Sequence, residues 1–387
     1  MIAALLFYYT KTKVETTSND PAFRSFQKTY YGVYLLAVAG DWLQGPHVYA
    51  LYQLYGMTKH QIEILFIAGF GSSLIFGTFV GAVADKFGRR WNCFLYGILY
   101  GASCITKHFP FMSILLIGRL LGGIATSILY SAFESWLLYE HSKRGFNEQQ
   151  LGTILSNASV GNSIVAILAG IVAQFAADQF GYVAPFDLSL IVLGCMAFLV
   201  LKSWPENYGN ERAPVKESFI RATELLRSDH RVLCLGLVQA LFEGAMYTFV
   251  LEWTPALTQA APIGSTIPHG LIFASFMVAT MIGSSLFTVL TKLTSVENMC
   301  VGIFWPSMAY LRGVYLPEET RSTTINMFRI PLNLIVIFIL YQNLAMHTIF
   351  QFCSLFLLMA ATAQHFLYSW SSSHSHSTEK ELLQHSP

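Results

Sequence analysis

Charged side chains are scarce in this chain. Asp, Glu, Lys and Arg together make up 12% of its 387 residues, about half of their share in soluble domains. The net charge is only +1, and no stretch interleaves basic with aromatic side chains, so the composition excludes a nucleic-acid partner. Hydrophobic residues make up 54% of the chain. That excess is too large for one globular core and indicates that a lipid bilayer surrounds much of the protein.

Paired cysteines are also lacking. The six cysteines stand singly inside apolar runs, without C-x-x-C or Cys/His spacing, so we expect neither a disulfide framework nor a metal site. No nucleophile is paired with a base, and no Walker-type glycine loop is present to hold a nucleotide. The sequence therefore predicts a protein that is not an enzyme, carries no cofactor and is not driven directly by ATP.

What the chain has in abundance is apolar runs of roughly 18 to 25 residues, each long enough to cross a bilayer as a helix. These runs predict an all-α membrane protein with about eleven apolar helices. The expected spans are residues 30–52, 61–84, 91–107, 110–138, 151–177, 183–202, 231–253, 270–292, 296–316, 326–346 and 347–370.

A long polar stretch divides these spans into two groups. It holds two prolines and a predicted amphipathic helix at about residues 218–226, which indicates a linker between two helical bundles. The expected organisation is an N-terminal segment at 1–29, a six-helix bundle at 30–202, a cytoplasmic linker at 203–230, a C-terminal bundle at 231–370 and a disordered cytoplasmic tail at 371–387.

A weak internal repeat supports two bundles. At an offset of 171 positions, five residues of the first half recur in the second, and parallel repeats of this kind occur in transporters. They are Tyr139, Glu148, Thr153, Ile154 and Asn162, which recur as Tyr310, Glu319, Thr324, Ile325 and Asn333.

Basic residues concentrate in alternate connections between the spans. Lys86, Arg89 and Arg90 lie between the second and third spans, Lys143 and Arg144 follow the fourth, and further basic residues fill the linker. Because cytoplasmic loops carry the excess of Lys and Arg, we expect the N-terminus and the linker in the cytoplasm.

The second half then has a parity problem. The spans at 270–292 and 296–316 are both followed by segments that look cytoplasmic, and one crossing cannot join two ends on the same side. Either the span at 296–316 is re-entrant, or a helix is missing near residues 293–297. We favour a missing helix, which would leave a shortened C-terminal bundle and one span fewer than twelve.

The connection between the second and third spans carries a ten-residue motif. It reads G-A-V-A-D-K-F-G-R-R and includes Gly81, Asp85, Gly88, Arg89 and Arg90. Gly81 allows close helix approach, and Gly88 supplies the freedom that a short turn needs. The run resembles the loop between helices two and three of the major facilitator superfamily, which implies the two-bundle fold of that superfamily and a role of these five residues in gating.

Four ionisable residues of the spans are candidates for the transport pathway, and insertion of each charge into the bilayer costs roughly 2.5 to 3.5 kcal/mol. Asp41 and Glu243 occupy equivalent first helices of the two halves, and each either lines a cavity or joins an ion pair. Arg119 either binds an anion or neutralises Asp41. Glu134 closes an inner gate or extends to the interface. Arg329, at the inner start of its span, is interpreted as a gate contact.

Longer runs of residues resemble one branch of this superfamily. Asp41-Trp42-Leu43-Gln44, Gly118-Arg119-Leu120-Leu121-Gly122-Gly123 and Phe328-Arg329-Ile330-Pro331-Leu332 are among those similar to the molybdate-anion transporter branch of the superfamily. The resemblance implies secondary-active uptake of molybdate across the plasma membrane by alternating access, with Arg119 on the transport path. Coupling would use protons carried by Asp41, Glu134 or Glu243. The alternatives are another small solute or oxyanion, such as sulfate, and a shortened isoform that regulates a full-length relative.

Overall fold

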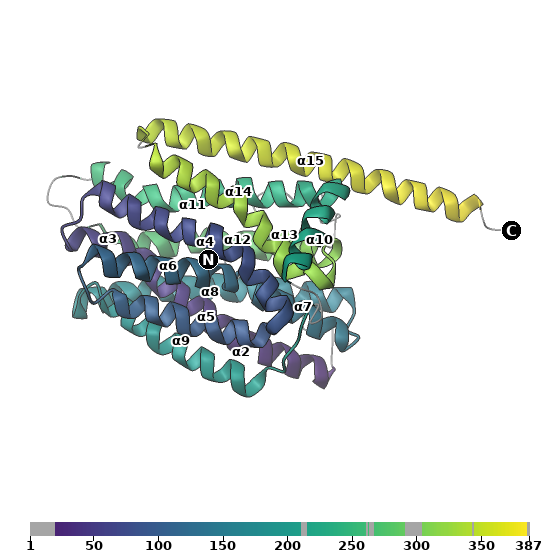
Figure 1. Cartoon of the computed structure of the whole chain (residues 1–387), viewed down its shortest axis with the longest axis horizontal. Helices are drawn as coiled ribbons and strands as arrows, with labels where there is room; N and C mark the ends of the chain where they lie inside the picture. Colours follow the sequence, from purple (N-terminus) through teal and green to yellow (C-terminus); the bar gives the residue numbers. More distant parts are fainter. Residues whose placement is uncertain are drawn as a thin grey trace.

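The computed structural model describes residues 20–209, 215–260, 262, 267–290, 304–342 and 344–384. Every regular element in these ranges is an α-helix or a short 3₁₀ helix, so the expected all-α class is confirmed. Most of the long helices run side by side along one direction (Figure 1). The predicted missing helix near residues 293–297 lies outside the described residues.

Nine elements form the N-terminal bundle. Two aromatic side chains at its centre, Trp136 and Trp204, stack with ring centroids 3.7 Å apart, and Tyr30 stacks against both. The elements are α2 (Pro21–Gln44), η1 (Gly45–His47), α3 (Val48–Leu54), α4 (Lys59–Phe87), α5 (Arg89–Thr106), α6 (Met112–Leu129), α7 (Ala132–Lys143), α8 (Glu148–Phe180) and α9 (Ala184–Ser203).

Local sequence explains where these helices begin and break. Thr58 and Asn147 each form a capping box with the residue three positions on, which fixes the starts of α4 and α8. Gly45 and Pro46 interrupt the first expected span and convert it into α2, η1 and α3. The fourth expected span also breaks, at Tyr130 and Ser131, into α6 and α7.

The remaining elements form the linker helix and the C-terminal bundle. Hydrogen bonds from Arg231 fix the turn between α10 and α11, and they hold the pKa of the Asp229 carboxyl below its ordinary value. The elements are α10 (Val215–Ser228), α11 (His230–Ala260), α12 (His269–Leu290), α13 (Phe304–Tyr315), η3 (Glu318–Thr320), α14 (Arg321–Tyr341) and α15 (Met346–Gln384).

Helix packing is nearly symmetric between the two bundles. In the first bundle α2 packs on α8 and α9, and in the second α11 packs on α14 and α15. The bundles meet mainly through two pairs of helices, α4 with α14 and α8 with α12. The 171-residue offset carries α7 onto α13 and the start of α8 onto the start of α14. The arrangement is that of two parallel repeats around a central axis.

The symmetry fails at one place in the described chain. In the first bundle α5 packs on α6 and α9. At the corresponding place in the second bundle, only the thirteen residues 291–303 lie between α12 and α13, fewer than one crossing needs. α13 itself has 12 residues, or about 18 Å of helix, so it cannot cross about 30 Å of hydrocarbon. Thirteen residues are therefore too few for full counterparts of α5 and α6, which have 18 residues each.

The disorder expected of the tail from residue 371 stays a prediction, and the last helix extends into that segment. α15 continues to Gln384 and projects as the yellow helix beyond the rest of the molecule (Figure 1). The segment contains no proline or glycine before Gln384, and its Glu, Lys and Leu residues favour helix. A polar composition alone therefore did not end the helix.

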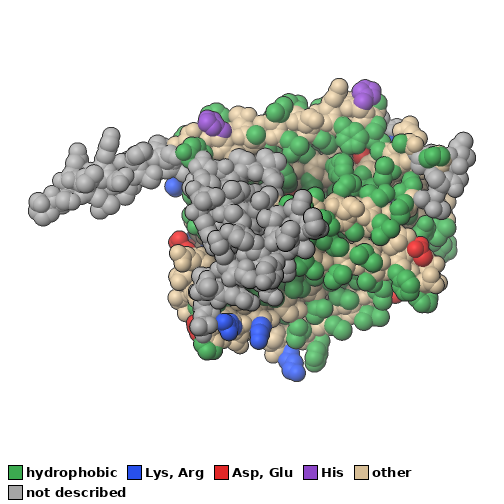
Figure 2. Space-filling view, turned by 180° about the vertical axis from the view of Figure 1, so that it is seen from behind, with side chains coloured by type: hydrophobic (Ala, Val, Ile, Leu, Met, Phe, Trp, Pro, Cys, Tyr) green, Lys and Arg blue, Asp and Glu red, His purple; other side chains and the backbone are tan. Residues whose placement is uncertain are grey.

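The exterior suits a bilayer. Seven helices in the described ranges are long and apolar enough to cross a membrane, and His269–Gly283 is a shorter apolar helix. Large hydrophobic side chains such as Phe175, Ile191 and Phe198 are more than half exposed. Figure 2 shows hydrophobic side chains spread over one broad face. This is an integral multi-pass membrane protein.

Candidate functional site

A buried ion-pair network joins the two bundles at the end that carries the α4–α5 turn; we call this end the basic face. Arg89 Nη2 donates to Asp85 Oδ1 at 2.9 Å, and Arg89 Nη1 donates to Glu318 Oε1 at 2.5 Å. The Asp85 and Arg89 side chains are fully buried. Asp85 Oδ2 accepts from the amide and hydroxyl of Thr323 in the first turn of α14, where the helix dipole favours a negative charge. We name Asp85, Arg89, Glu318 and Thr323 the latch.

Two glycines make room for the latch. A Cβ on Gly81 would lie 2.6 Å from the Ser322 carbonyl oxygen, so α4 and α14 approach closely there. Gly88 has φ +111°, and a Cβ on it would lie 2.5 Å from the Glu206 carboxyl. Arg90 contacts the same carboxyl, with Glu206 Oε1 accepting from its backbone amide at 2.8 Å. The five motif residues thus connect both bundles and the segment after α9.

A second ion pair also joins the two bundles. Arg312 of α13 donates to both oxygens of Glu134 in α7, at 2.8 Å and 2.5 Å. A third nitrogen of Arg312 donates to Gln239 Oε1 in α11 at 2.9 Å. All guanidinium nitrogens of Arg312 are therefore occupied, and Glu134 is held by a bidentate contact rather than directed toward lipid.

A third pair is much looser. Arg329 of α14 and Glu243 of α11 are 2% and 1% exposed, yet Arg329 Nη1 lies 3.8 Å from Glu243 Oε2, which is too long for a hydrogen bond. Neither Glu243 oxygen has a hydrogen-bond partner, and Nε and Nη1 of Arg329 have none. The guanidinium lies over the Tyr130 ring, 4.8 Å from its centroid. This pair lies at the interface because Tyr130 belongs to the other bundle.

Asp41 lies near the end of α2, close to the helix break. Its Oδ1 accepts a 2.6 Å hydrogen bond from the Tyr100 hydroxyl of α5, and it lies near enough to Arg329 to interact electrostatically. Asp41 therefore faces the interior toward the second bundle.

Arg119 lies apart from these pairs, in the outer half of α6. Its Nε donates to the Leu65 carbonyl at 3.3 Å, and its guanidinium lies 4.4 Å from the centroid of the Phe66 ring. Among the described residues no carboxylate lies within ion-pair distance of Arg119, so it is not the partner of Asp41. Its side chain is partly exposed.

The outer end is closed by contacts between α8 and α12. A Cβ on Gly170 would lie 2.9 Å from the Gly270 carbonyl oxygen, and Gln174 Oε1 accepts from the Gly270 amide at 3.0 Å. Trp42 contacts Phe273 of α12 and donates to Asn162 of α8. Both ends of the passage between the bundles are therefore closed in this structure.

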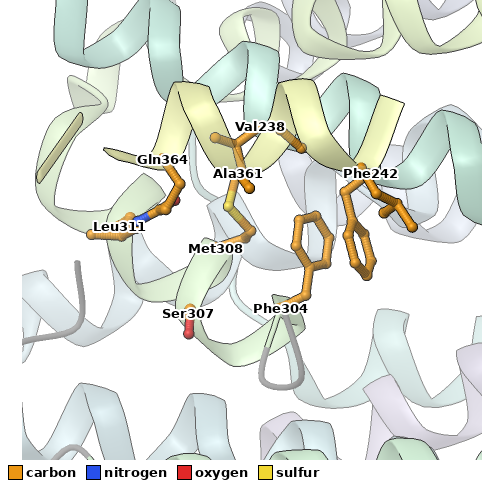
Figure 3. A pocket seen from close by; sticks show the side chains of 10 residues that line it. Val238, Phe242, Phe304, Ser307, Met308, Leu311, Ala361 and Gln364 are labelled. Carbon is orange, nitrogen blue, oxygen red and sulfur yellow. The ribbon is translucent and has the colours of Figure 1, made fainter. Parts of the chain in front are cut away.

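A small pocket lies elsewhere in the second bundle, between α11, α13 and α15 (Figure 3). Its volume is about 30 Å³ and its lining is mostly apolar, including Val238, Phe304 and Met308. Its lining residues carry no charge, so it offers no cation to a tetrahedral oxyanion. Ser307 of its lining corresponds, at the 171-residue offset, to Trp136.

The structure thus brings three of the four intramembrane candidates toward one interior. Asp41, Glu134 and Glu243 gather around Arg312 and Arg329, whereas Arg119 lies outside this group. Sequence reasoning took Arg312 for a loop flank and Arg329 for a gate contact. The sequence did hold a signal for their burial. Both arginines follow apolar residues within helices, at 304–315 and 321–341.

Solved structures show which fold this is. The human organic anion transporter MFSD10 (TETRAN) matches 90% of this chain and 100% of its own, with a TM-score of 0.63 and 14% identity. The major facilitator superfamily proton:xylose symporter XylE matches 91% of this chain and 96% of its own, with a TM-score of 0.67 and 13% identity. The expected major facilitator fold is confirmed.

Relatives in sequence show the family within this fold. Residues 1–312 match the family described as sugar transporters with 12 TM, MFS_5. The molybdate-anion transporter of Xenopus tropicalis is 34% identical over 86% of this chain and 83% of its own. That of Danio rerio is 32% identical over 83% of this chain and 80% of its own. The chain belongs to the MFS_5 family of the major facilitator superfamily, in the group of the molybdate-anion transporters.

Proposed function

We propose that this protein is a secondary-active transporter that takes up molybdate by alternating access. The observation that carries the proposal is a pair of buried arginines, Arg312 and Arg329, at the bundle interface of a chain whose relatives are named for a dianionic cargo. Guanidinium groups suit oxyanions because they donate several hydrogen bonds from one planar cation. The proposed location is the plasma membrane, with the N-terminus and the linker cytoplasmic.

Uptake of a dianion needs a coupled cation. Moving each negative charge against an inside-negative potential costs about 2.3 kcal/mol per 100 mV. Protons are the simplest co-ion, and Asp41, Glu134 and Glu243 are the proposed carriers because their carboxyl groups lie along the interior between the bundles. This coupling requires that uptake increases when the outside is made more acidic than the inside.

The contacts at the two ends support alternating access. Opening toward the outside would separate α8 from α12 at Gly170 and Gly270, while the latch keeps the basic face shut. Opening toward the cytoplasm would release the latch and separate α4 from α14 while the outer contact re-forms. Each state is stabilised by contacts that the other must break, which is the condition for a two-state carrier.

The direct test is uptake into proteoliposomes that contain the purified chain. We expect saturable accumulation of labelled molybdate, dissipated by a protonophore and absent from empty vesicles. Excess sulfate distinguishes a selective molybdate carrier, which sulfate inhibits weakly, from a general oxyanion carrier, which it blocks. Absence of any molybdate flux in vesicles that hold folded protein would contradict the proposal.

A second function is favoured by one observation. Residues 291–303 leave too little chain for counterparts of α5 and α6, so the second bundle is smaller than the first. Such a chain could act as a non-transporting regulator of a full-length relative. Co-reconstitution decides this alternative: a regulator shows no flux alone and changes the flux of the full-length protein that it binds.

Arg119 is proposed to receive the anion on its way inward from the outer side. Replacing it by glutamine should raise the half-saturating molybdate concentration, by roughly tenfold if one charge-assisted hydrogen bond is lost, with less effect on maximal rate. Initial uptake rates over a range of molybdate concentrations measure this. An unchanged concentration dependence would remove Arg119 from the path.

A further inference from the structure

One face of α14 carries buried polar atoms that have no partner. Asn326, Arg329 and Asn333 are each at most 2% exposed, and their spacing of three and four residues places them on one side of the helix. Asn326 Oδ1, Arg329 Nε and Nη1, and both side-chain polar atoms of Asn333 lack hydrogen-bond partners. Buried polar groups are nearly always paired, so a concentration of unpaired ones indicates a place for a polar ligand.

The chemistry of this face favours an anion. Arg329 contributes a full positive charge, and the Asn333 amide contributes neutral donors about one helical turn away. Arg329 lies about 12 Å along the axis from the start of α14, inside the hydrocarbon depth. Tyr130 covers one side of the guanidinium. A charge left so poorly paired at this depth is costly, and a bound counter-ion would offset that cost.

Glu243 is the only carboxylate in ion-pair distance of Arg329 among the described residues, and it makes a poor partner. At 3.8 Å it neutralises charge without donating or accepting a hydrogen bond. The neighbouring pair shows the contrast, because Arg312 binds both oxygens of Glu134. A loose pair can exchange its carboxylate for another anion at smaller cost than a tight one.

We propose that Arg329, with Asn333, forms the binding site for a tetrahedral dianion such as molybdate, and that Glu243 is a built-in competitor that occupies the guanidinium when the anion is absent. This inference rests on the proposed function and adds to it the place where the cargo binds. When the dianion binds, Glu243 takes up a proton from the aqueous side and leaves Arg329 to the oxyanion oxygens. The proton travels with the anion and is released when Glu243 re-forms its pair.

The site predicts opposite effects for its two charged members. Arg329→Gln should weaken binding by roughly tenfold or more, because it removes the cation. Glu243→Gln should strengthen binding, because glutamine resembles the protonated acid and no longer competes. A purely structural ion pair predicts loss of stability in both variants and no gain of affinity in either. Arg329→Lys, which keeps the charge, should retain part of the affinity.

The experiment is isothermal titration calorimetry of the purified full chain with sodium molybdate, sodium tungstate and sodium nitrate, with thermal melting to verify folding. Arg227→Gln is the matched control, because Arg227 is an exposed arginine at the end of α10. We expect wild type and Arg227→Gln to bind the two dianions but not nitrate, Arg329→Gln to lose binding, and Glu243→Gln to bind more tightly and to gain more thermal stability from molybdate.

Each contrary result has a separate meaning. If wild type binds molybdate and Arg329→Gln binds equally well, the site is wrong while the transport function stands. If Glu243→Gln binds more weakly than wild type, its role as competitor is wrong. If folded wild type binds neither dianion, both the site and the proposed function are wrong. Should Arg329→Gln fail to fold, the Glu243→Gln and Arg329→Lys titrations still decide the question.

Discussion

Replacing Arg89 by alanine should cost more stability than any other single change at the basic face. The substitution leaves Asp85 fully buried without its cation and leaves Glu318 with Arg321 as its remaining arginine partner. Breaking a buried pair from one side costs about 3–5 kcal/mol, and we expect the melting temperature to fall by about 5 °C or more. Transport should fall with it, because an outward-facing protein without the latch cannot keep the basic face closed. Thermal melting and molybdate uptake measure the two effects.

Arg90→Ala is the control for this experiment. It removes a neighbouring arginine from the same turn, but the Arg90 side chain is 28% exposed and its ion pair with Glu206 is 3.5 Å long. A longer pair that keeps part of the arginine in solvent contributes less than the fully buried pair of Arg89 with Asp85. Equal losses in the two variants would mean that the latch has no special role and that any change of this turn disturbs the fold.

The second large effect concerns the glycines at the two ends of the passage. Gly81→Val should prevent closure at the basic face, and Gly170→Val should prevent closure at the outer end, because each added side chain meets backbone of the other bundle. Overpacking typically costs about 1–3 kcal/mol. This is enough to shift the equilibrium between the closed and open forms of one end by roughly tenfold or more. Both variants should lose most molybdate uptake for opposite reasons.

Spin labels distinguish the two trapped states. Labels at Phe175 and Leu271, both exposed near the outer end, should move apart in Gly170→Val but not in Gly81→Val. Gly71→Val in α4 and Gly152→Val in α8 are matched controls, since a Cβ at either position meets nothing within 4 Å. Controls that lose uptake equally would show that valine harms these helices by itself and not through the interface.

Much of the fold was predictable because its signals are local. Apolar length indicates a spanning helix wherever it occurs, and the turn containing Gly88 combines glycine with basic residues within ten positions. The parity argument was also local, since it counted basic flanks on either side of one span. It favoured a missing helix near residues 293–297, which lie outside the described residues.

The central pairs could not be read in the same way. Glu134 and Arg312 are 178 positions apart, and only the packing of α7 against the second bundle brings them together. The depth of Arg329 could not be predicted, because hydropathy does not give depth when the preceding helix is too short to span. The break at Tyr130 and Ser131 has no proline or glycine to announce it, so tertiary packing decided it.

The unequal bundles have a consequence for the surroundings of the protein. In the apolar window of α15 only 17% of the residues are buried, against 39% in α9. Acyl chains are as apolar as leucine and fill such flanks without a hydrophobic penalty. We therefore expect annular lipid to cover the exposed face of α15 in the smaller bundle. The choice of detergent or nanodisc should then decide whether the purified protein stays folded.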